Sequence, residues 1–311
     1  MIEITKYTNN NKAEWNEFIS NSKNGVFLFY RDFMDYHSDR FQDYSLMFYK
    51  ENDLVALLPA NILGNTIQSH AGLTFGGLVT NKKISTVLTL EIFEELKVFF
   101  KKHTINKLIY KQIPYIFHLF PAEEDVYALY RNNARILKQE ASSLIYLQDK
   151  IKFSKGKKCG ISKAKKACLE VQESKDYQSF FEIEKELLQK KHKTKPIHTA
   201  EEMEMLSGNF PENIKLFGVF KNNKMLAGSI IFKNNQTVHT QYIGSDDEGK
   251  ELGALDYLMD YLINSYYANE KYFDFGISTE NKGLHLNEGL IAQKEMFGGR
   301  TIIYNTYEMD I

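Results

Sequence analysis

The stretch IKLFGVFKNNKMLAGSIIFK, residues 214–233, decides the fold. Its apolar segments 214–220 and 225–233 flank the polar tetrad Lys221-Asn222-Asn223-Lys224, which supplies turn chemistry, and this pattern predicts a β-hairpin. Outward from the hairpin, the apolar spacing predicts further elements on both sides. These are a helix over 174–193, a strand over 237–243, a helix over 253–268, and strands over 271–275 and 300–308.

The first half of the chain repeats this order about 170 residues earlier. It is expected to hold helices over 14–20, 27–41 and 85–103 and strands over 44–49, 54–62 and 107–111. The glycine-rich segment 69–77 predicts a loop where the backbone approaches another group closely. A duplicated α/β unit with mixed sheets explains the pattern best, with one domain over 1–146 and a second over 147–311.

Composition limits the class of protein. The 311 residues are 43% hydrophobic and 25% charged with a net charge of -1, which is ordinary globular usage and excludes a disordered or a polybasic chain. No secretory signal opens the sequence and no apolar run is long enough to span a bilayer, so we expect a soluble, cytoplasmic protein without a transmembrane segment. Cys159 and Cys168 lie outside any metal-binding pattern, so we expect two free thiols and no metal site.

Three stretches then resemble a known family. They are Phe27-Leu28 followed by the aromatic segment 30–33, the lysine-rich segment 154–166, and Phe273-Asp274-Phe275-Gly276 leading to the ending Lys-x-x-Phe-Gly at 294–298. The order hairpin, strand, glycine-bearing turn, helix, strand resembles the GNAT acyltransferase fold. Two such units in tandem resemble the FemABX peptidyltransferases. Residues 174–206 leave room for two short helices only, so the chain resembles the armless, FemX-like members.

The resemblance implies transfer of an aminoacyl or acyl group to an amine of a cell-envelope or polysaccharide precursor. The acceptor would be a small molecule or a glycan linked to a lipid or a nucleotide. In the family, a lysine of an N-terminal helix can meet substrate phosphate; His37 stands at that place here, which weakens the case for a UDP-linked muropeptide.

The donor is suggested by the turn at 248–253. A pyrophosphate needs backbone N–H groups and small residues, but Glu248 and Glu251 place carboxylates there, which would repel it. The turn therefore favours a donor other than acyl-CoA, and the family's donor is aminoacyl-tRNA. Between Lys150 and Lys195 there are fourteen lysines against six acidic residues, a basic stretch suited to tRNA phosphates or simply a solvated face. We expect no tightly bound cofactor.

Two residues are the candidates for catalysis. Lys294 matches the family's lysine and could stabilise an oxyanion or a phosphate, unless it is a surface lysine. Asp274 ends an apolar strand and could accept a proton or orient the amine, unless it is a cap.

Substrate contacts are expected mainly in polar loops. The loop 278–289 offers Ser278, Asn287 and Glu288, because glycine-punctuated polar loops suit binding. The remaining candidates for substrate binding are His37, Arg40, His192, His198, Tyr242 and Phe297.

Two other functions stay open from the sequence. One is an acetyl-CoA-dependent N-acetyltransferase acting on a sugar nucleotide or small amine through a non-standard cofactor turn. The other is a non-catalytic tandem module that binds a glycan or RNA.

Overall fold

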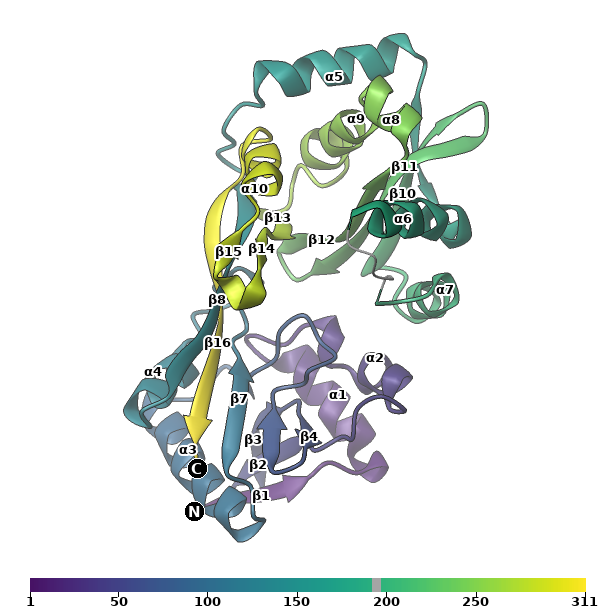
Figure 1. The fold of residues 1–311 in the computed structure, drawn as a ribbon. Helices are drawn as coiled ribbons and strands as arrows, with labels where there is room; N and C mark the ends of the chain where they lie inside the picture. The colour runs from purple at the N-terminus through teal and green to yellow at the C-terminus, as the bar shows by residue number, and fades with distance from the viewer. Residues whose placement is uncertain (192–196) are drawn as a thin grey trace. The chain divides into compact units, whose positions relative to one another are not determined.

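The computed structural model describes residues 1–191 and 197–311, and the chain forms two compact units (Figure 1). The first unit contains residues 1–141, 279–285 and 303–311; the second contains 142–278 and 286–302. Strands β8 (Arg135–Tyr146) and β16 (Arg300–Asp310) therefore each contribute residues to both units. The domain boundary at 146/147 stays a prediction.

The first unit has two sheets. The antiparallel sheet β1-β2-β3-β6 has its hairpin at β2 and β3, as the sequence predicts. In the other sheet β4 pairs antiparallel with β5, β5 parallel with β7, and β7 antiparallel with the end of β16. The strands are β1 (Ile2–Lys6), β2 (Leu46–Lys50), β3 (Asp53–Leu58), β4 (Asn61–Leu63), β5 (Thr66–Gln68), β6 (Val79–Thr80) and β7 (Lys107–Lys111). The helices are α1 (Lys12–Asn21), α2 (Arg31–Met34), α3 (Thr86–Lys102) and α4 (Glu124–Arg131).

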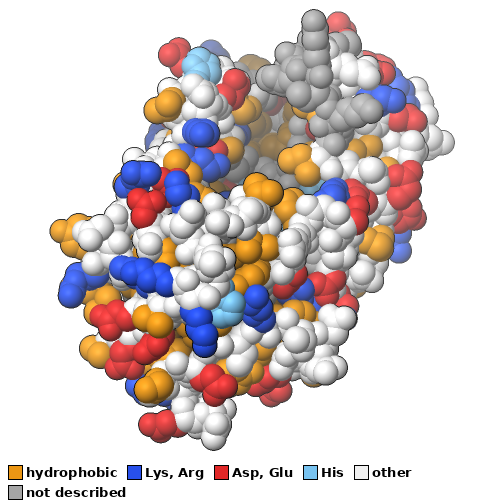
Figure 2. Space-filling model, turned by 60° about the horizontal axis from the view of Figure 1, so that its bottom comes forward, with side chains coloured by type: hydrophobic (Ala, Val, Ile, Leu, Met, Phe, Trp, Pro, Cys, Tyr) orange, Lys and Arg blue, Asp and Glu red, His pale blue; other side chains and the backbone are white. Residues whose placement is uncertain are grey.

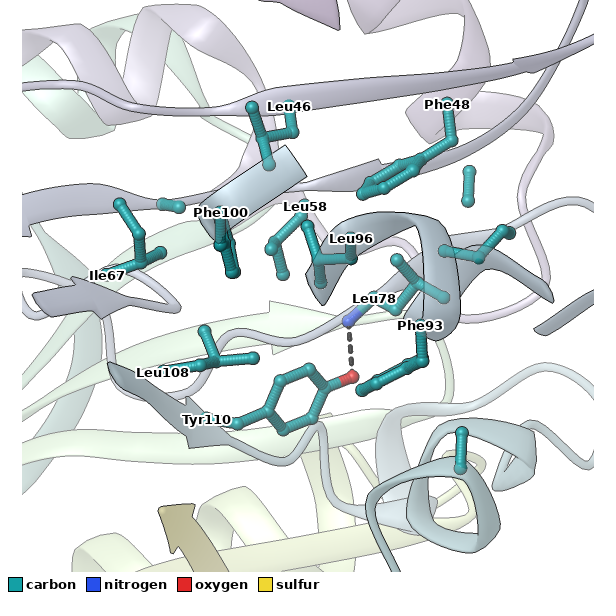
Figure 3. Close-up of a cluster of buried hydrophobic side chains, with 14 of the residues drawn as sticks. Leu46, Phe48, Leu58, Ile67, Leu78, Phe93, Leu96, Phe100, Leu108 and Tyr110 are labelled. Carbon is teal, nitrogen blue, oxygen red and sulfur yellow. Dashed lines mark hydrogen bonds between the residues drawn. The ribbon is translucent and has the colours of Figure 1, made fainter. Parts of the chain in front are cut away.

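The core of the first unit lies against α3, whose apolar face carries Phe93, Leu96 and Phe100 (Figure 3). Ser85 caps this helix by accepting a hydrogen bond from the Leu88 amide, so the sequence starts the helix where its amphipathic pattern begins. The hydroxyl of buried Tyr110 accepts a hydrogen bond from the Leu78 amide at 2.6 Å, so the polar tip of this core residue is satisfied.

The second unit contains the run of strands β8-β13-β12-β11-β10-β9 of a mixed sheet, in that order. All neighbours in it are antiparallel except β12 and β13, which run parallel. The strands are β9 (Glu170–Ser174), β10 (Ile214–Lys221), β11 (Lys224–Asn234), β12 (Thr237–Ser245) and β13 (Tyr272–Ile277). The helices are α5 (Lys155–Lys166), α6 (Tyr177–Lys191), α7 (Ala200–Asn209), α8 (Asp247–Leu252), α9 (Ala254–Tyr261) and α10 (Glu288–Glu295).

Helices cover both faces of this sheet. Successive strand residues point to opposite faces. In β11, Ala227 belongs to the core cluster that contains Leu258 and Met259 of α9, whereas a Cβ at Gly228 would meet the ring of Phe180 on α6. Thus α9 packs on one face and α6 on the other.

Most of the expected elements are confirmed, including the hairpin at 214–233 and the strand at 107–111. The single helix expected over 27–41 is wrong. The structure has a 3-10 turn (Phe27–Phe29), α2, and a second 3-10 turn (Asp35–His37), and Tyr30 between the first two is extended. Asn16 of α1 accepts a hydrogen bond from the Arg31 amide across this break. The aromatic residues of this segment are buried by several short turns, so their spacing does not mark one face of a single helix.

The expected loop at 278–289 contains short structure of its own. It holds β14 (Thr279–Glu280), a 3-10 turn (Asn281–Gly283) and β15 (His285–Leu286), and α10 begins at Glu288. None of the helices within the described ranges combines the length and apolar character that a bilayer crossing requires. On the face drawn in Figure 2, Lys and Arg side chains stand beside Asp and Glu side chains, in keeping with the net charge of -1.

Candidate active site

The candidate active site is a cavity of about 320 Å³ in the second unit, where β12 and β13 part. The parallel pairing joins β12 to β13 from Thr237↔Tyr272 to His239↔Asp274. Beyond that point the cavity is lined from both strands, by residues that include Gly244 and Phe275. Strands that separate leave backbone groups without a partner strand, and such groups can hydrogen-bond a molecule bound in the cavity.

Lys294 of α10 lies at this cavity and is buried, with 6% of its surface exposed. Its ammonium group donates hydrogen bonds to the carbonyl oxygens of Gly276 and Ile277, each at 2.8 Å. Burial lowers the pKa of Lys294 to about 8, while the charge of nearby Asp274 acts in the opposite direction. The amine is therefore mostly charged at neutral pH, and a buried cation faces the cavity.

Asp274 has no exposed surface, and both of its carboxylate oxygens are engaged. The Ser142 hydroxyl donates to Oδ1 and the Nδ1 of His239 donates to Oδ2, each at 2.6 Å. These contacts place a proton on Nδ1 of His239 and fix the orientation of the ring. Asp274 thus holds His239 in place beside Gly276, whose backbone carbonyl binds Lys294.

Three further candidates fall into two places. Phe297 lies at the same cavity, whereas Tyr242 and His198 lie together on the α6 side of the sheet. The ring of Phe297 lines the cavity, and the ammonium of Lys157 lies 4.3 Å from its centroid. Lys157 also forms an ion pair with Asp256 at 2.7 Å. The Tyr242 hydroxyl is hydrogen-bonded to Nδ1 of His198 at 2.6 Å. His192 lies outside the described residues.

Ser278, Asn287 and Glu288, the substrate-binding candidates of the loop at 278–289, differ in burial and in hydrogen bonding. Asn287 caps α10 by accepting a hydrogen bond from the Leu290 amide at 3.0 Å. Glu288 is exposed in the first turn of that helix, and Ser278 is buried with its carbonyl accepting from the Asn287 amide. The cap and the buried serine hold the start of α10, which carries Lys294 in its last turn.

His37 and Arg40 belong to the first unit. His37 is buried and stacks on His70 with ring centroids 5.2 Å apart. A Cβ at Gly72 would collide with the rings of His37 and Phe41, so the glycine-rich loop is where backbone approaches these side chains. Burial lowers the pKa of His37, which favours the neutral ring. Arg40 is exposed, with its guanidinium over the Tyr36 ring.

The turn after β12 is closed by the chain's own carboxylates. Asp246 caps α8 and accepts a hydrogen bond from the Gly249 amide at 2.7 Å, so it occupies an N–H group that an anion would otherwise use. Glu248 forms ion pairs with Lys221 and Lys224 at the surface. Gly253 has a left-handed backbone and separates α8 from α9.

The basic stretch Lys150–Lys195 includes α5, whose exposed surface carries five lysines. They are Lys155, Lys158, Lys163, Lys165 and Lys166. Cys159 and Cys168 are exposed free thiols in this region. No group of three or more His, Cys, Asp or Glu that could hold a metal ion is found in the part of the chain that the structure describes.

The comparisons first define a class of protein. Residues 160–281 match the model of the acetyltransferase (GNAT) domain family. This match spans most of the sheet of the second unit, including β12 and β13. The chain thus has an acyltransferase fold of the GNAT type. No curated protein sequence is similar enough to the chain to count as a match.

Solved structures then identify more particular likenesses. The crystal structure of FemX is similar over 99% of this chain and 97% of that chain, with a TM-score of 0.69 and 9% identity. L-PGS from Bacillus licheniformis is similar over 86% and 83%, with a TM-score of 0.58 and 13% identity. A tandem GNAT protein from the clavulanic acid biosynthesis pathway is similar over 100% and 98%, with a TM-score of 0.50 and 10% identity. The expected FemX-like fold with two tandem GNAT-like units and mixed sheets is confirmed.

His239 and Ser142 are parts of this site that the sequence did not indicate. Neither lies in a motif, and they reach Asp274 only because β8 and β12 are its two neighbours in the sheet. The signal that the sequence offers is one histidine near the start of the expected strand 237–243 and one aspartate in the expected strand 271–275, which become partners when the two strands pair.

Proposed function

We propose that the chain transfers an aminoacyl group from charged tRNA to an amine of a cell-envelope or polysaccharide precursor. The observation that carries the proposal is the buried ammonium of Lys294, which lies at the cavity of a GNAT-type unit. The aminoacyl donor and the envelope acceptor are what the resemblance to the FemABX family implies, and the likeness to FemX supports the fold that this resemblance predicts.

Lys294 is suited to stabilise the oxyanion that forms when an amine attacks an acyl carbonyl. An ammonium has three N–H donors, and the carbonyl oxygens of Gly276 and Ile277 take two of them. The third is left for a substrate oxygen. A charge that is held in place before the reaction stabilises the transition state without reorganisation, which is the source of its effect on the rate.

Asp274 acts as a positioning residue in this scheme. Because both of its oxygens are occupied by Ser142 and His239, it orients the histidine and adds negative charge near Lys294. That charge helps to keep Lys294 protonated inside the protein.

The choice of donor rests on α8 and α5. Asp246 fills the turn where a pyrophosphate would have to bind, and Glu248 adds a second carboxylate beside it. The lysines of α5 offer exposed positive charge for the phosphates of tRNA. Together they favour a tRNA-linked donor over acyl-CoA.

The test measures transfer from radiolabelled aminoacyl-tRNA and from acetyl-CoA side by side. The acceptors are UDP-linked amino sugars and lysine-containing peptides. The Lys294→Ala variant is expected to lose about 100-fold or more of kcat/KM. The matched control is Lys101→Ala, which removes an exposed lysine of α3, outside the basic stretch. Equal rates for the Lys294 variant and the wild type would remove the role assigned to Lys294.

The second candidate is an acetyl-CoA-dependent N-acetyltransferase acting on a sugar nucleotide or small amine. It is favoured by the position of the cavity, which is lined by Ser245 and by Lys250 of α8, directly at the turn after β12. Calorimetry with coenzyme A separates the two candidates, since low-micromolar binding would support the second. If neither donor is used while a glycan or RNA still binds, the chain is a binding module.

A further inference from the structure

Glu184 of α6 is a buried carboxylate among apolar neighbours. It has 7% of its surface exposed, and Phe181 and Leu187 lie one turn away on either side along the helix. Charged residues are rarely this buried unless they are paired, so its surroundings call for an explanation.

The sheet makes room for this carboxylate at one glycine. A Cβ at Gly244 of β12 would collide with Oε1 of Glu184 and would lie 3.3 Å from Leu187. Gly244 and Leu187 both line the cavity. The carboxylate therefore lies directly behind the cavity wall at Gly244, where β12 carries no side chain.

Glu184 has no counter-charge among the described residues. Its Oε1 has no hydrogen-bond partner there. On β12, Tyr242 stands two residues before Gly244, and its hydroxyl is hydrogen-bonded to His198. The two cavity lysines are engaged elsewhere: Lys250 pairs with Asp247, and Lys294 binds backbone carbonyls. Burial raises the pKa of Glu184 to about 7.

An unpaired carboxylate of this kind suits proton transfer. A side chain works best as a base when it releases and takes up its proton near the working pH. Asp274 is less suited, because its two oxygens already accept hydrogen bonds from Ser142 and His239.

We propose that Glu184 is a catalytic residue that accepts a proton from the acceptor amine during acyl transfer. This rests on the transferase function proposed above. The ammonium of the acceptor gives one proton to the Glu184 carboxylate and becomes a neutral amine. Its nitrogen lone pair forms the C–N bond to the acyl carbon as the bond from that carbon to the carrier oxygen or sulfur breaks. The second proton lost by the nitrogen goes to the carrier atom, and Glu184 releases its proton to solvent.

The first experiment compares Glu184→Gln with Glu186→Gln across pH. Glutamine keeps the shape of glutamate but cannot accept the proton, and Glu186 is exposed on the same helix. We expect Glu184→Gln to lose about 100-fold or more of kcat/KM near pH 7.5, with the acid side of its pH profile flattened. Glu186→Gln should match the wild type.

The second experiment measures the carboxyl group directly. Carbon-13 NMR of protein labelled at glutamate carboxyls, compared with the same spectrum of Glu184→Gln, reports the pKa of Glu184 and also shows that the variant is folded. A midpoint near 7 supports the proposal, and an ordinary midpoint near the unperturbed glutamate value overturns it.

The two proposals fail in different ways. If the wild type transfers an acyl group and Glu184→Gln is equally active, only the role of Glu184 is overturned. If the wild type transfers from neither charged tRNA nor acetyl-CoA, the proposed function is overturned, and the role of Glu184 falls with it.

Discussion

Lys294 lines the cavity, Glu184 lies behind its wall at Gly244, and burial shifts the pKa values of these two side chains toward each other. Burial lowers the pKa of Lys294 to about 8 and raises the pKa of Glu184 to about 7. Burial disfavours the charged form of each group, so one cation titrates lower and one acid titrates higher than usual. Between these values both groups are mostly charged, which is the state that the proposed chemistry needs.

A narrow bell-shaped pH profile follows from this pair. We expect kcat/KM of the wild type to rise through about pH 7 as Glu184 ionises and to fall through about pH 8 as Lys294 loses its proton. The measurement is steady-state transfer from pH 5.5 to 10. A flat profile across pH 7 to 9 would contradict the assignment of both groups.

Glu184 also makes stability depend on pH. Its folded pKa is raised above that of the unfolded chain, so its contribution to stability is present below pH 4.5 and is lost as pH rises through about 7. A shift of this size corresponds to an order of 3 kcal/mol at alkaline pH. We expect Glu184→Gln to unfold at a higher temperature than the wild type at pH 8.5, with the difference shrinking at pH 5. Thermal melts at both pH values check this. An equal difference in melting temperature between variant and wild type at pH 5 and pH 8.5 would contradict it.

At the scale of elements, the contact of α6 with β12 depends on one glycine. Gly244 leaves space for the Glu184 carboxylate, and the same residue lines the cavity. The contact therefore links the packing of a helix on the sheet to the shape of the site.

We expect Gly244→Ala to lower the free energy of unfolding by about 1–3 kcal/mol, because the added methyl group overpacks this contact. Glu184→Ala in the same background should restore part of the loss, since it removes the colliding group. Denaturant melts of both single variants and the double variant give the coupling. Gly208→Ala is the control, because a Cβ at that helical position meets nothing within 4 Å. Additive effects of the two changes would show that the contact is absent.

The elements that sequence reasoning found are those with a strong apolar period. The hairpin of β10 and β11 and the helix α3 have such a pattern, and they were predicted. Helix α5 was not, because its lysines and two glycines give it only three buried residues, Lys157, Ile161 and Ala164. The outer half of β8 is mostly exposed, so its alternation is weak.

The site was predicted only where residues lie in a motif. Lys294 and Asp274 stand in stretches that resemble a family, and the structure places them close enough to interact. His239, Ser142 and Glu184 lie on β12, β8 and α6. Strand pairing brings the first two to Asp274, and the packing of α6 on the sheet brings Glu184 to Gly244. One local signal does distinguish Glu184, because it stands at helical spacing between Phe181 and Leu187, whereas the exposed Glu182 and Glu186 lie off that apolar stripe.

At the scale of the whole molecule, the two units share an order of elements but not a site. In the first unit, the strand that follows the long helix carries Tyr110, whose hydroxyl is bound to Asp125 and to the Leu78 amide. In the second unit, the corresponding strand carries Asp274 beside a cavity lysine. The chemistry is therefore expected in the second unit.

The surface of that unit should set the affinity for tRNA. We expect a variant with glutamine at four exposed α5 positions, Lys155, Lys158, Lys163 and Lys166, to bind tRNA more weakly. The slope of log K against log salt should fall by about 3, as four lost phosphate contacts predict. Lys82, Lys83, Lys101 and Lys102, which are exposed and lie outside the basic stretch, provide the control set. Filter binding at several salt concentrations is the measurement; equal slopes for both sets would rule out α5 as the tRNA surface.

The path of the chain also limits how the protein can be divided. Residues 306–310 of β16 pair with β7, although they come after the whole of the second unit in sequence. A gene fragment ending near residue 141 would therefore leave the edge of β7 without its partner, open to pairing with other chains. Half-length expression products should aggregate for that reason. A split protein would need the final nine residues, either supplied as a separate peptide or joined to the first unit by circular permutation.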